Sequence, residues 1–144
     1  MMYYKCRSFK IYELVDPATY SFYGEKAWMF FRPEALMSLD AIKDFYDVTV
    51  SVNNWRWGGK FKWRGLRTLT CKEGGDLSQH RLGGGFDLDV KGVLASKVRE
   101  DIMENKDGVF KLITRLEATL KGEPISWVHF DCANVPERII LLHL

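Results

Sequence analysis

A run of three glycines at 83–85 constrains this chain more than any other local feature, because it separates a histidine from a predicted strand. His80 precedes the run, and residues 86–90 after it alternate apolar with acidic side chains, which is typical of a strand with one buried face. A glycine turn lets His80 lie before the bend while Asp87 enters the strand. Both side chains could then face one centre.

This pair of side chains has the chemistry of a metal site. Imidazole nitrogen and carboxylate oxygen are ordinary zinc ligands, and a catalytic zinc uses three protein ligands plus water. His129 is the best candidate for the third ligand, because it lies in a short aromatic segment at 126–131, beside Asp131. Two alternatives stay open: His80 could cap a loop turn, and His129 could be a satisfied core histidine. His143 is expected to be a surface or packing residue.

The length of 144 residues fits one domain over 1–144 that buries its own core. Apolar residues that recur every three or four positions predict helices over 33–46, over 93–105 and through Val109, Ile113, Leu116 and Leu120. Strands are predicted at 9–15, 48–52, 86–90, 126–131 and 138–142, with a further apolar run at 27–31 and mainly loop over 53–75. Helices and strands mix without a regular βαβ rhythm, which favours the α+β class.

Two motifs of a known family match this chain in order: Ser78, His80, Gly83 and Asp87 in the first, Trp127 and His129 in the second. The family motifs are Ser-x-His-x-x-Gly-x-Ala-x-Asp and Trp-x-His. On these residues the chain resembles the zinc D-Ala-D-Ala carboxypeptidases and L-Ala-D-Glu endopeptidases, which share the hedgehog fold. The resemblance implies a small antiparallel sheet with helices on one side. It also implies that Zn²⁺ is the cofactor, held by His80, Asp87 and His129.

The chain departs from the family pattern at two positions. Gly85 stands where the family usually has alanine, which is a mild change. Ser126 stands three residues before His129, where many members place an acidic general base, and serine cannot act as a base near neutral pH. Asp131 should point to the same strand face as His129, and is expected either to be the base or to orient a ligand. Glu123 is a weaker candidate.

The resemblance extends upstream, where 50–55 and 65–67 are similar to the strand and arginine loop of phage-encoded members. It implies that Arg67 faces the substrate, stabilising an oxyanion or pairing with a carboxylate, although Arg67 could also be an ordinary surface residue. The implied function is a zinc peptidase that cleaves peptidoglycan stem peptides, as a carboxypeptidase or an endolysin-type endopeptidase. The alternative, kept open by Ser126, is a non-catalytic zinc-bearing module that binds the cell wall or belongs to a phage particle.

Aromatic and basic residues alternate over 53–67, at Trp55, Arg56, Trp57, Lys60, Phe61, Lys62, Trp63, Arg64 and Arg67. Three interpretations stay open for this loop: tryptophans that pin it to the core, contact with a wall polymer, or a groove for single-stranded nucleic acid. Nucleic acid is the least favoured, since the formal net charge is only +2. The glycine run lacks the Lys-Ser/Thr of a phosphate-binding loop, so nucleotide binding is not expected.

The three cysteines, Cys6, Cys71 and Cys132, are widely spaced and form no Cys-x-x-Cys pair. We expect reduced thiols that pack as small hydrophobes, with Cys71 as a weak alternative metal ligand. The N-terminus lacks the apolar region of a signal peptide, and no apolar run approaches the ~20 residues that span a bilayer. We therefore expect cytoplasmic synthesis without a signal peptide. The resemblance implies release to the cell wall as a phage protein.

Overall fold

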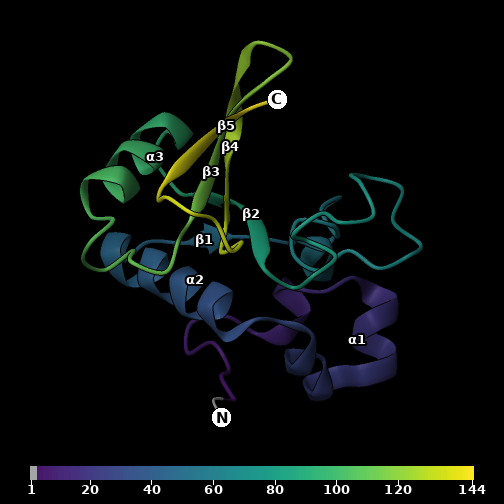
Figure 1. The fold of residues 1–144 in the computed structure, drawn as a ribbon. Coiled ribbons are helices and arrows are strands. Elements are labelled where there is room, and N and C mark those ends of the chain that lie inside the picture. The colour runs from purple at the N-terminus through teal and green to yellow at the C-terminus, as the bar shows by residue number, and fades with distance from the viewer. Residues whose placement is uncertain (1–2) are drawn as a thin grey trace.

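A five-stranded sheet organises residues 3–144, the part of the chain that this computed structural model describes (Figure 1). The strand order across the sheet is β1-β2-β4-β3-β5. The strands are β1 (Val50–Ser51), β2 (Gly85–Val90), β3 (Arg115–Leu120), β4 (Glu123–Asp131) and β5 (Ile140–His143). Together with the helices described below, they confirm the predicted α+β class.

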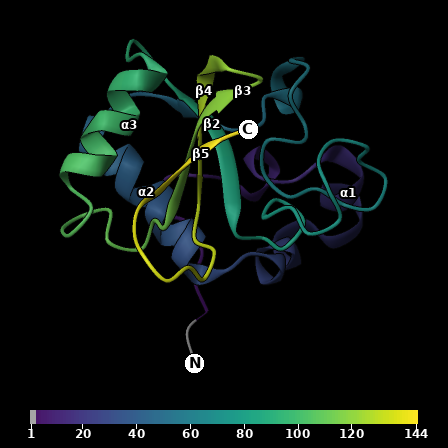
Figure 2. The same ribbon diagram turned by 45° about the horizontal axis from the view of Figure 1, so that its top comes forward.

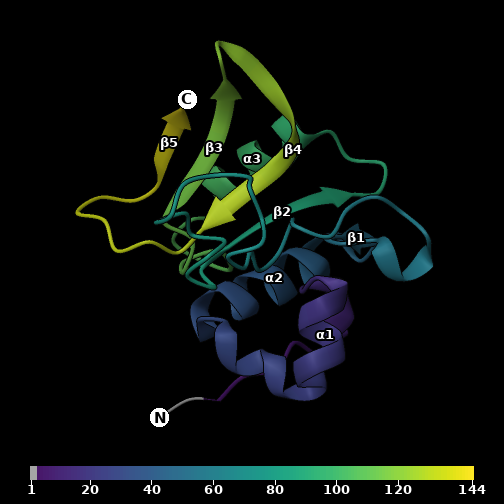
Figure 3. The same ribbon diagram turned by 90° about the vertical axis from the view of Figure 1, so that its right-hand side faces the viewer.

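The sheet is mixed, so the expectation of a purely antiparallel sheet is wrong. The pairs β1–β2, β2–β4 and β3–β4 are antiparallel, whereas β5 runs parallel to β3 (Figure 3). The cause lies in the connection 132–139. Strand β4 ends where Asp131 faces Arg115, at the start of β3, so a short connection delivers Ile140 to that same end. The last strand then runs in the direction of β3.

Two helices cover one face of the sheet. Helix α2 (Pro33–Tyr46) begins at the predicted proline, whose fixed φ and missing N–H suit a first helical turn. Helix α3 (Ala95–Glu104) lies inside the predicted range 93–105. Both pack against buried Phe86, Leu88 and Phe130 from the sheet, in one continuous core. The segment that joins β1 to β2 lies on the opposite side of the sheet (Figures 1 and 2).

The N-terminal strand predicted at 9–15 is wrong. That segment forms the 3-10 turn η1 (Ile11–Glu13), and it is followed by helix α1 (Pro17–Tyr23) and a longer 3-10 turn, η2 (Gly24–Phe30). Asp16 caps α1 by accepting hydrogen bonds from the backbone N–H groups of Ala18 and Thr19 at 3.1 and 3.2 Å. The Asp-Pro pair therefore starts a helix here and does not end a strand.

The third predicted helix, through Val109 and Leu120, is also wrong. Its first half forms turns, and its second half is strand β3. The spacing of Leu116 and Leu120 suits a helix, but pairing with β4 and β5 on both sides outweighs that local pattern. This error matters for the site, because a strand directs Arg115 and Glu117 to the sheet face opposite the core.

The remaining predicted strands are confirmed with shifted ends. Strand β1 is shorter than 48–52, and β4 extends back to Glu123. The loop predicted over 53–75 is confirmed, with one 3-10 turn, η3 (Trp55–Trp57), inside it. Within residues 3–144, no helix combines the length and apolar character needed to cross a bilayer.

Candidate metal centre

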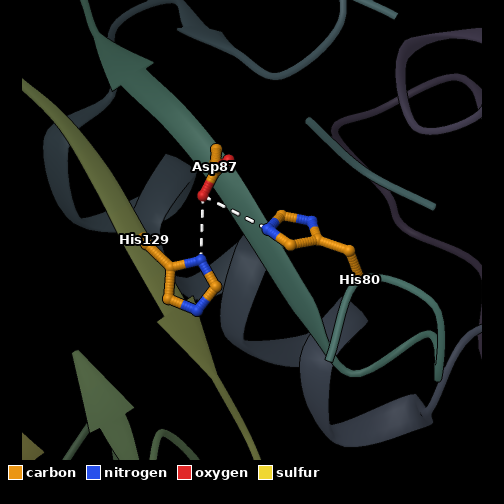
Figure 4. Close-up of side chains that lie close together, drawn as sticks. All are labelled: His80, Asp87 and His129. Carbon is orange, nitrogen blue, oxygen red and sulfur yellow. Dashed lines mark hydrogen bonds and ion pairs between the residues drawn. The ribbon is translucent and has the colours of Figure 1, made fainter. Parts of the chain in front are cut away.

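Three buried polar side chains meet on the sheet face opposite the core. Asp87 on β2 lies directly opposite His129 on β4 in the strand register, so both point to the same side. His80 reaches them from the loop that precedes the glycine turn (Figure 4). Their exposed fractions are 3% for His80, 8% for Asp87 and 6% for His129. The structure thus brings together the three residues that the sequence predicts as ligands.

The glycine turn holds His80 in place through a close approach that only glycine permits. Gly83 has φ 70°, in the left-handed region, and a Cβ built there would lie 1.9 Å from the carbonyl oxygen of Phe30. Gly85 is less constrained, because its added Cβ would lie 3.1 Å from the Cβ of Asp131. The alanine usual in the family would therefore need only a small adjustment at Gly85, as the sequence predicts.

The ligand atoms of these residues converge closely. The distance from His129 Nδ1 to Asp87 Oδ1 is 2.8 Å, and that from His80 Nε2 to the same oxygen is 3.4 Å (Figure 4). Within the described part of the chain, this is the group of histidine, cysteine and acidic side chains close enough to hold a metal ion, with ligand atoms within 4.8 Å of one another. Cys71 is not among them.

Hydrogen bonds on the far side of each imidazole decide which nitrogen carries its proton. His80 Nδ1 lies 2.9 Å from the carbonyl oxygen of Gly65, which can only accept, so Nδ1 is the donor. His129 Nε2 lies 3.0 Å from Asp131 Oδ2, and it donates there for the same reason. With one proton on each ring, the nitrogens that face the Asp87 carboxylate, His80 Nε2 and His129 Nδ1, would offer lone pairs to a bound cation. Three acceptors turned toward one point fit a bound cation.

The same convergence shifts the pKa values of the group without a metal. For His129, burial favours the neutral ring, but hydrogen bonds to Asp131 and Asp87 outweigh it and raise the pKa to about 9. For Asp87, burial likewise favours the neutral acid. Hydrogen bonds from His129 and His80 outweigh it and hold the pKa of Asp87 well below its usual range. The centre therefore attracts positive charge, as a proton or as a metal ion.

Asp131 is completely buried and makes the contacts of a residue that orients a ligand. Arg115 donates to both of its oxygens, from Nε at 2.8 Å and from Nη2 at 2.9 Å, and the backbone N–H of Ala133 donates at 3.2 Å. Burial alone would raise the pKa of Asp131. Hydrogen bonds from His129 and Arg115 outweigh that effect, so its pKa is lower than usual. Of the two roles expected for Asp131, these contacts favour orientation of His129 over proton transfer.

Arg67 lies beside the candidate metal centre. Its Nη2 is 3.3 Å from Asp87 Oδ2 and 3.7 Å from Glu73 Oε2, while its Nε donates to the carbonyl oxygen of Trp63 at 2.9 Å. Its backbone N–H also donates to the carbonyl of His80 at 3.1 Å. A guanidinium held this way borders the candidate metal centre and lines the clefts beside it.

Glu117 is the acidic residue that the sequence analysis missed. It faces His129 in the register of β3 and β4, and its Oε2 lies 3.9 Å from His129 Nδ1. The helical interpretation of 109–120 concealed it. The signal that could have revealed it is the alternation of charged and apolar residues at Arg115, Leu116 and Glu117.

The other acidic and histidine candidates lie away from the ligand atoms. Glu123 is exposed at the start of β4, and Ser126 is exposed on the same strand. His143 is exposed and lies 3.1 Å from the hydroxyl of Thr119, in agreement with its expected surface role.

Two clefts open beside the centre, and both are bordered by Arg67, Asp87 and Trp127. The first, of about 440 Å³, is called the cationic cleft and includes Lys60, Lys62, Trp63, Arg64 and Ser126. The second, of about 490 Å³, is called the leucine cleft and includes Leu77, Leu120, Leu142, Leu144, Glu117 and His129. All three candidate ligands therefore border the leucine cleft, and Asp87 borders the cationic cleft as well.

The aromatic, basic loop divides into two parts. Its first part is pinned to the N-terminal segment, because the indole N–H of Trp55 and the amide of Asn53 both donate to the carbonyl of Val15, at 2.8 and 3.1 Å. Its second part, from Lys60 to Arg67, lines the cationic cleft. The interpretation of a loop pinned by its tryptophans therefore describes only the first part.

No family model, curated protein or solved structure matches this chain.

Proposed function

We propose that the protein is a zinc-dependent peptidase that cleaves peptide bonds in peptidoglycan stem peptides. The observation that carries the proposal is the convergence of two imidazole nitrogens and one carboxylate oxygen at His80, Asp87 and His129, with a further carboxylate, Glu117, beside them. The choice of substrate is supported by the two family motifs. Release to the cell wall as a phage protein belongs to the same proposal.

The donor set supports zinc as the metal. Two imidazole nitrogens and one carboxylate oxygen form a common ligand set for catalytic zinc, which keeps a fourth position open. Harder ions such as Mg²⁺ and Ca²⁺ prefer oxygen ligands alone. Zinc held here would supply Lewis acidity that lowers the pKa of water and polarises a substrate carbonyl.

Glu117 supplies the carboxylate that Ser126 lacks. Its side chain is mostly buried on the strand next to His129, on the same face of the sheet as the three ligands. From that position it can accept the proton of an attacking water and return it to the leaving amine. In this proposal the base is a residue of the neighbouring strand β3 and not a residue close to His129 in the sequence.

Arg67 and Asp131 have supporting roles in the proposed reaction. Arg67 borders the centre with its guanidinium, where it can stabilise negative charge that develops on the scissile carbonyl oxygen. Asp131, itself held by Arg115, keeps the N–H of His129 turned away from the centre. Replacing Asp131 should therefore affect metal affinity first and turnover only as a consequence.

Zinc content and stem-peptide hydrolysis, measured together on three variants, test the proposal. Native protein should carry about one zinc per chain and hydrolyse the peptide. His80→Ala should lose both, whereas Glu117→Gln should keep its zinc and lose hydrolysis by about 10²-fold or more. Glu123→Gln is the matched control and should change neither property. Full activity of Glu117→Gln would refute the assignment of the base.

The alternative function is a zinc-bearing module that binds the cell wall or a phage particle without catalysis. The absence of a carboxylate at Ser126 is the observation that favours it. This alternative predicts stoichiometric zinc and stem-peptide binding, but no hydrolysis by any of the variants.

A further inference from the structure

Residues 68–79 form a loop, called the wall loop, that joins Arg67 to the candidate ligand His80. It contains turns but no helix or strand. Its two ends lie together, because the backbone N–H of Arg67 donates to the carbonyl oxygen of His80 at 3.1 Å. A compact loop of this length with adjoining ends is an Ω-loop, a kind of segment that often has a functional role.

The wall loop contributes to both clefts beside the candidate metal centre. Gly74, Gly75, Leu77 and Ser78 line the leucine cleft, and Glu73 lines the cationic cleft. At Gly74 the chain passes so close to Arg67 that a Cβ added there would lie 2.9 Å from Nη1. The conformation of this loop therefore determines the shape of one side of the leucine cleft.

Arg81, which directly follows His80, ties three parts of the wall loop together. Its guanidinium donates to three backbone carbonyl oxygens: from Nη1 to Thr68 at 2.9 Å, from Nη2 to Cys71 at 2.7 Å and from Nε to Gly75 at 3.1 Å. The carbonyl of Thr68 also accepts the backbone N–H of Cys71 at 3.0 Å. Because a guanidinium directs its donors in a rigid plane, this one side chain fixes three points of the backbone.

His80 is also held by contacts that do not involve Arg81. Its Nδ1 lies 2.9 Å from the carbonyl oxygen of Gly65, and its own carbonyl accepts from Arg67. The close approach of Gly83 to Phe30 fixes the turn that follows. The hydrogen bonds of Arg81 thus shape the cleft wall, whereas the candidate ligand has separate support.

From these contacts we propose that Arg81 is a positioning residue, which holds the wall loop in the shape that a stem peptide requires in the leucine cleft. This inference rests on the proposed peptidase function and adds a residue that governs peptide binding and not the metal. Without the three hydrogen bonds the loop gains other conformations, and only the fraction that keeps the wall binds the peptide at full affinity. A fall of that fraction to about one tenth weakens binding about tenfold.

Arg81→Met tests the inference, because methionine keeps an unbranched side chain and removes every donor. The substrate is a synthetic stem peptide that contains L-Ala-D-Glu and ends in D-Ala-D-Ala. Zinc-loaded Arg81→Met should hydrolyse it with KM raised about tenfold and kcat changed by less than about twofold, because only peptide binding is lost. Its zinc affinity, measured by chelator competition, should fall by less than the about tenfold expected for a residue that orients a metal ligand.

Two further variants separate the hydrogen bonds from other effects of the substitution. Arg81→Lys keeps the positive charge, but one ammonium group cannot reproduce the planar set of donors, so most of the rise in KM should remain. Arg138→Met is the matched control, because Arg138 also donates to backbone carbonyls, those of Lys106 and Ile113, but lines neither cleft. It should leave KM unchanged. A KM fully restored in Arg81→Lys, or raised equally in Arg138→Met, would overturn the inference.

Hydrogen exchange tests the wall loop independently of turnover. In Arg81→Met, the amides of residues 68–79 should exchange at least about tenfold faster, while those of the central sheet keep their rates, because only the loop opens more often. Mass spectrometry of peptic fragments measures both regions in one experiment. Unchanged exchange over 68–79 would overturn the role of Arg81.

Separate outcomes decide the positioning role and the peptidase. If the native protein hydrolyses nothing, calorimetry with the same stem peptide replaces kinetics. Binding about tenfold weaker in Arg81→Met would then support the positioning role and contradict the peptidase. Hydrolysis with the same KM in the native protein and in Arg81→Met would support the peptidase and overturn the positioning role. Absence of peptide binding by native, zinc-loaded protein would overturn both.

Discussion

The two faces of the central sheet use the same strands for opposite purposes. Along β2, Phe86 and Leu88 enter the apolar core, while the intervening Asp87 points to the metal centre. Along β4, Phe130 and His129 divide in the same way. Both faces are buried. On the core face, burying each apolar side chain stabilises the fold. On the site face, burying polar side chains costs free energy unless each polar group has a partner. The difference separates side chains that stabilise the fold from side chains that form the candidate metal centre.

The largest effect is expected on the core face. Phe86→Ala should lower the free energy of unfolding by about 3–5 kcal/mol, because it leaves a cavity among closely packed rings. Urea unfolding followed by circular dichroism measures this loss. Leu69→Ala is the control: its side chain is 94% exposed, and it should change the free energy of unfolding by less than about 0.5 kcal/mol. An unchanged midpoint for Phe86→Ala would contradict the assignment of this face to the core.

The next effect is the stabilisation of the site face by zinc. With free zinc at about 100 times its Kd, the free energy of unfolding should rise by about 2.7 kcal/mol relative to chelator-treated protein. The gain should vanish in His129→Ala, which lacks one ligand. Thermal unfolding with and without added zinc provides the measurement. A zinc-dependent rise that persists in His129→Ala would place the metal elsewhere.

A smaller effect, on zinc affinity, is expected from Asp131, which contacts the candidate ligand His129. Asp131→Asn should weaken zinc binding by about 10–100-fold, since an amide no longer fixes the orientation of the His129 ring as a carboxylate does. Competition with a chromogenic chelator measures the affinity. Asp89→Asn is the matched control, because Asp89 lies on the same side of β2 as Asp87 but pairs with Arg64. Equal affinities in the two variants would contradict the role of Asp131.

The smallest effect concerns the reactivity of Cys132, a buried thiol that directly follows strand β4. Burial raises the pKa of Cys132 to about 12, so almost none of it is thiolate at pH 8. Iodoacetamide at pH 8 should therefore label Cys132 in the native protein far more slowly than in urea, because the thiolate is the reactive form. Peptide mapping by mass spectrometry measures the rates. Rapid native labelling would show that this end of the core is open.

Local sequence signals were sufficient where a segment contains both its starting residue and a regular spacing of apolar residues. Helix α2 begins at Pro33 and ends at Tyr46 as predicted, because the proline and the apolar repeat both lie within it. The turn at 83–85 and strand β2 were predictable for the same reason. His80 and Asp87 could thus be placed together from one short stretch of sequence.

Pairing between strands distant in the sequence determined the features that the sequence analysis missed. Leu116 and Leu120 have helical spacing, yet β3 forms because it pairs with β4 and β5. The positions of Arg115 and Glu117 beside the centre follow only from that register. Asp16-Pro17 carries a helix-start signal that the prediction of a strand at 9–15 left unused. The three candidate ligands were predictable from motifs, whereas the positions of the residues around them depended on how the sheet assembles.

X-ray absorption at the zinc edge of native, zinc-loaded protein identifies the atoms that bind the metal. Nitrogen and oxygen ligands are expected at about 2.0–2.1 Å, with the multiple scattering of two imidazoles and no sulfur. His129→Ala should remove the scattering of one ring or the metal altogether. A ligand shell containing sulfur at about 2.3 Å, or a native spectrum that His129→Ala leaves unchanged, would contradict a metal centre built from His80, Asp87 and His129.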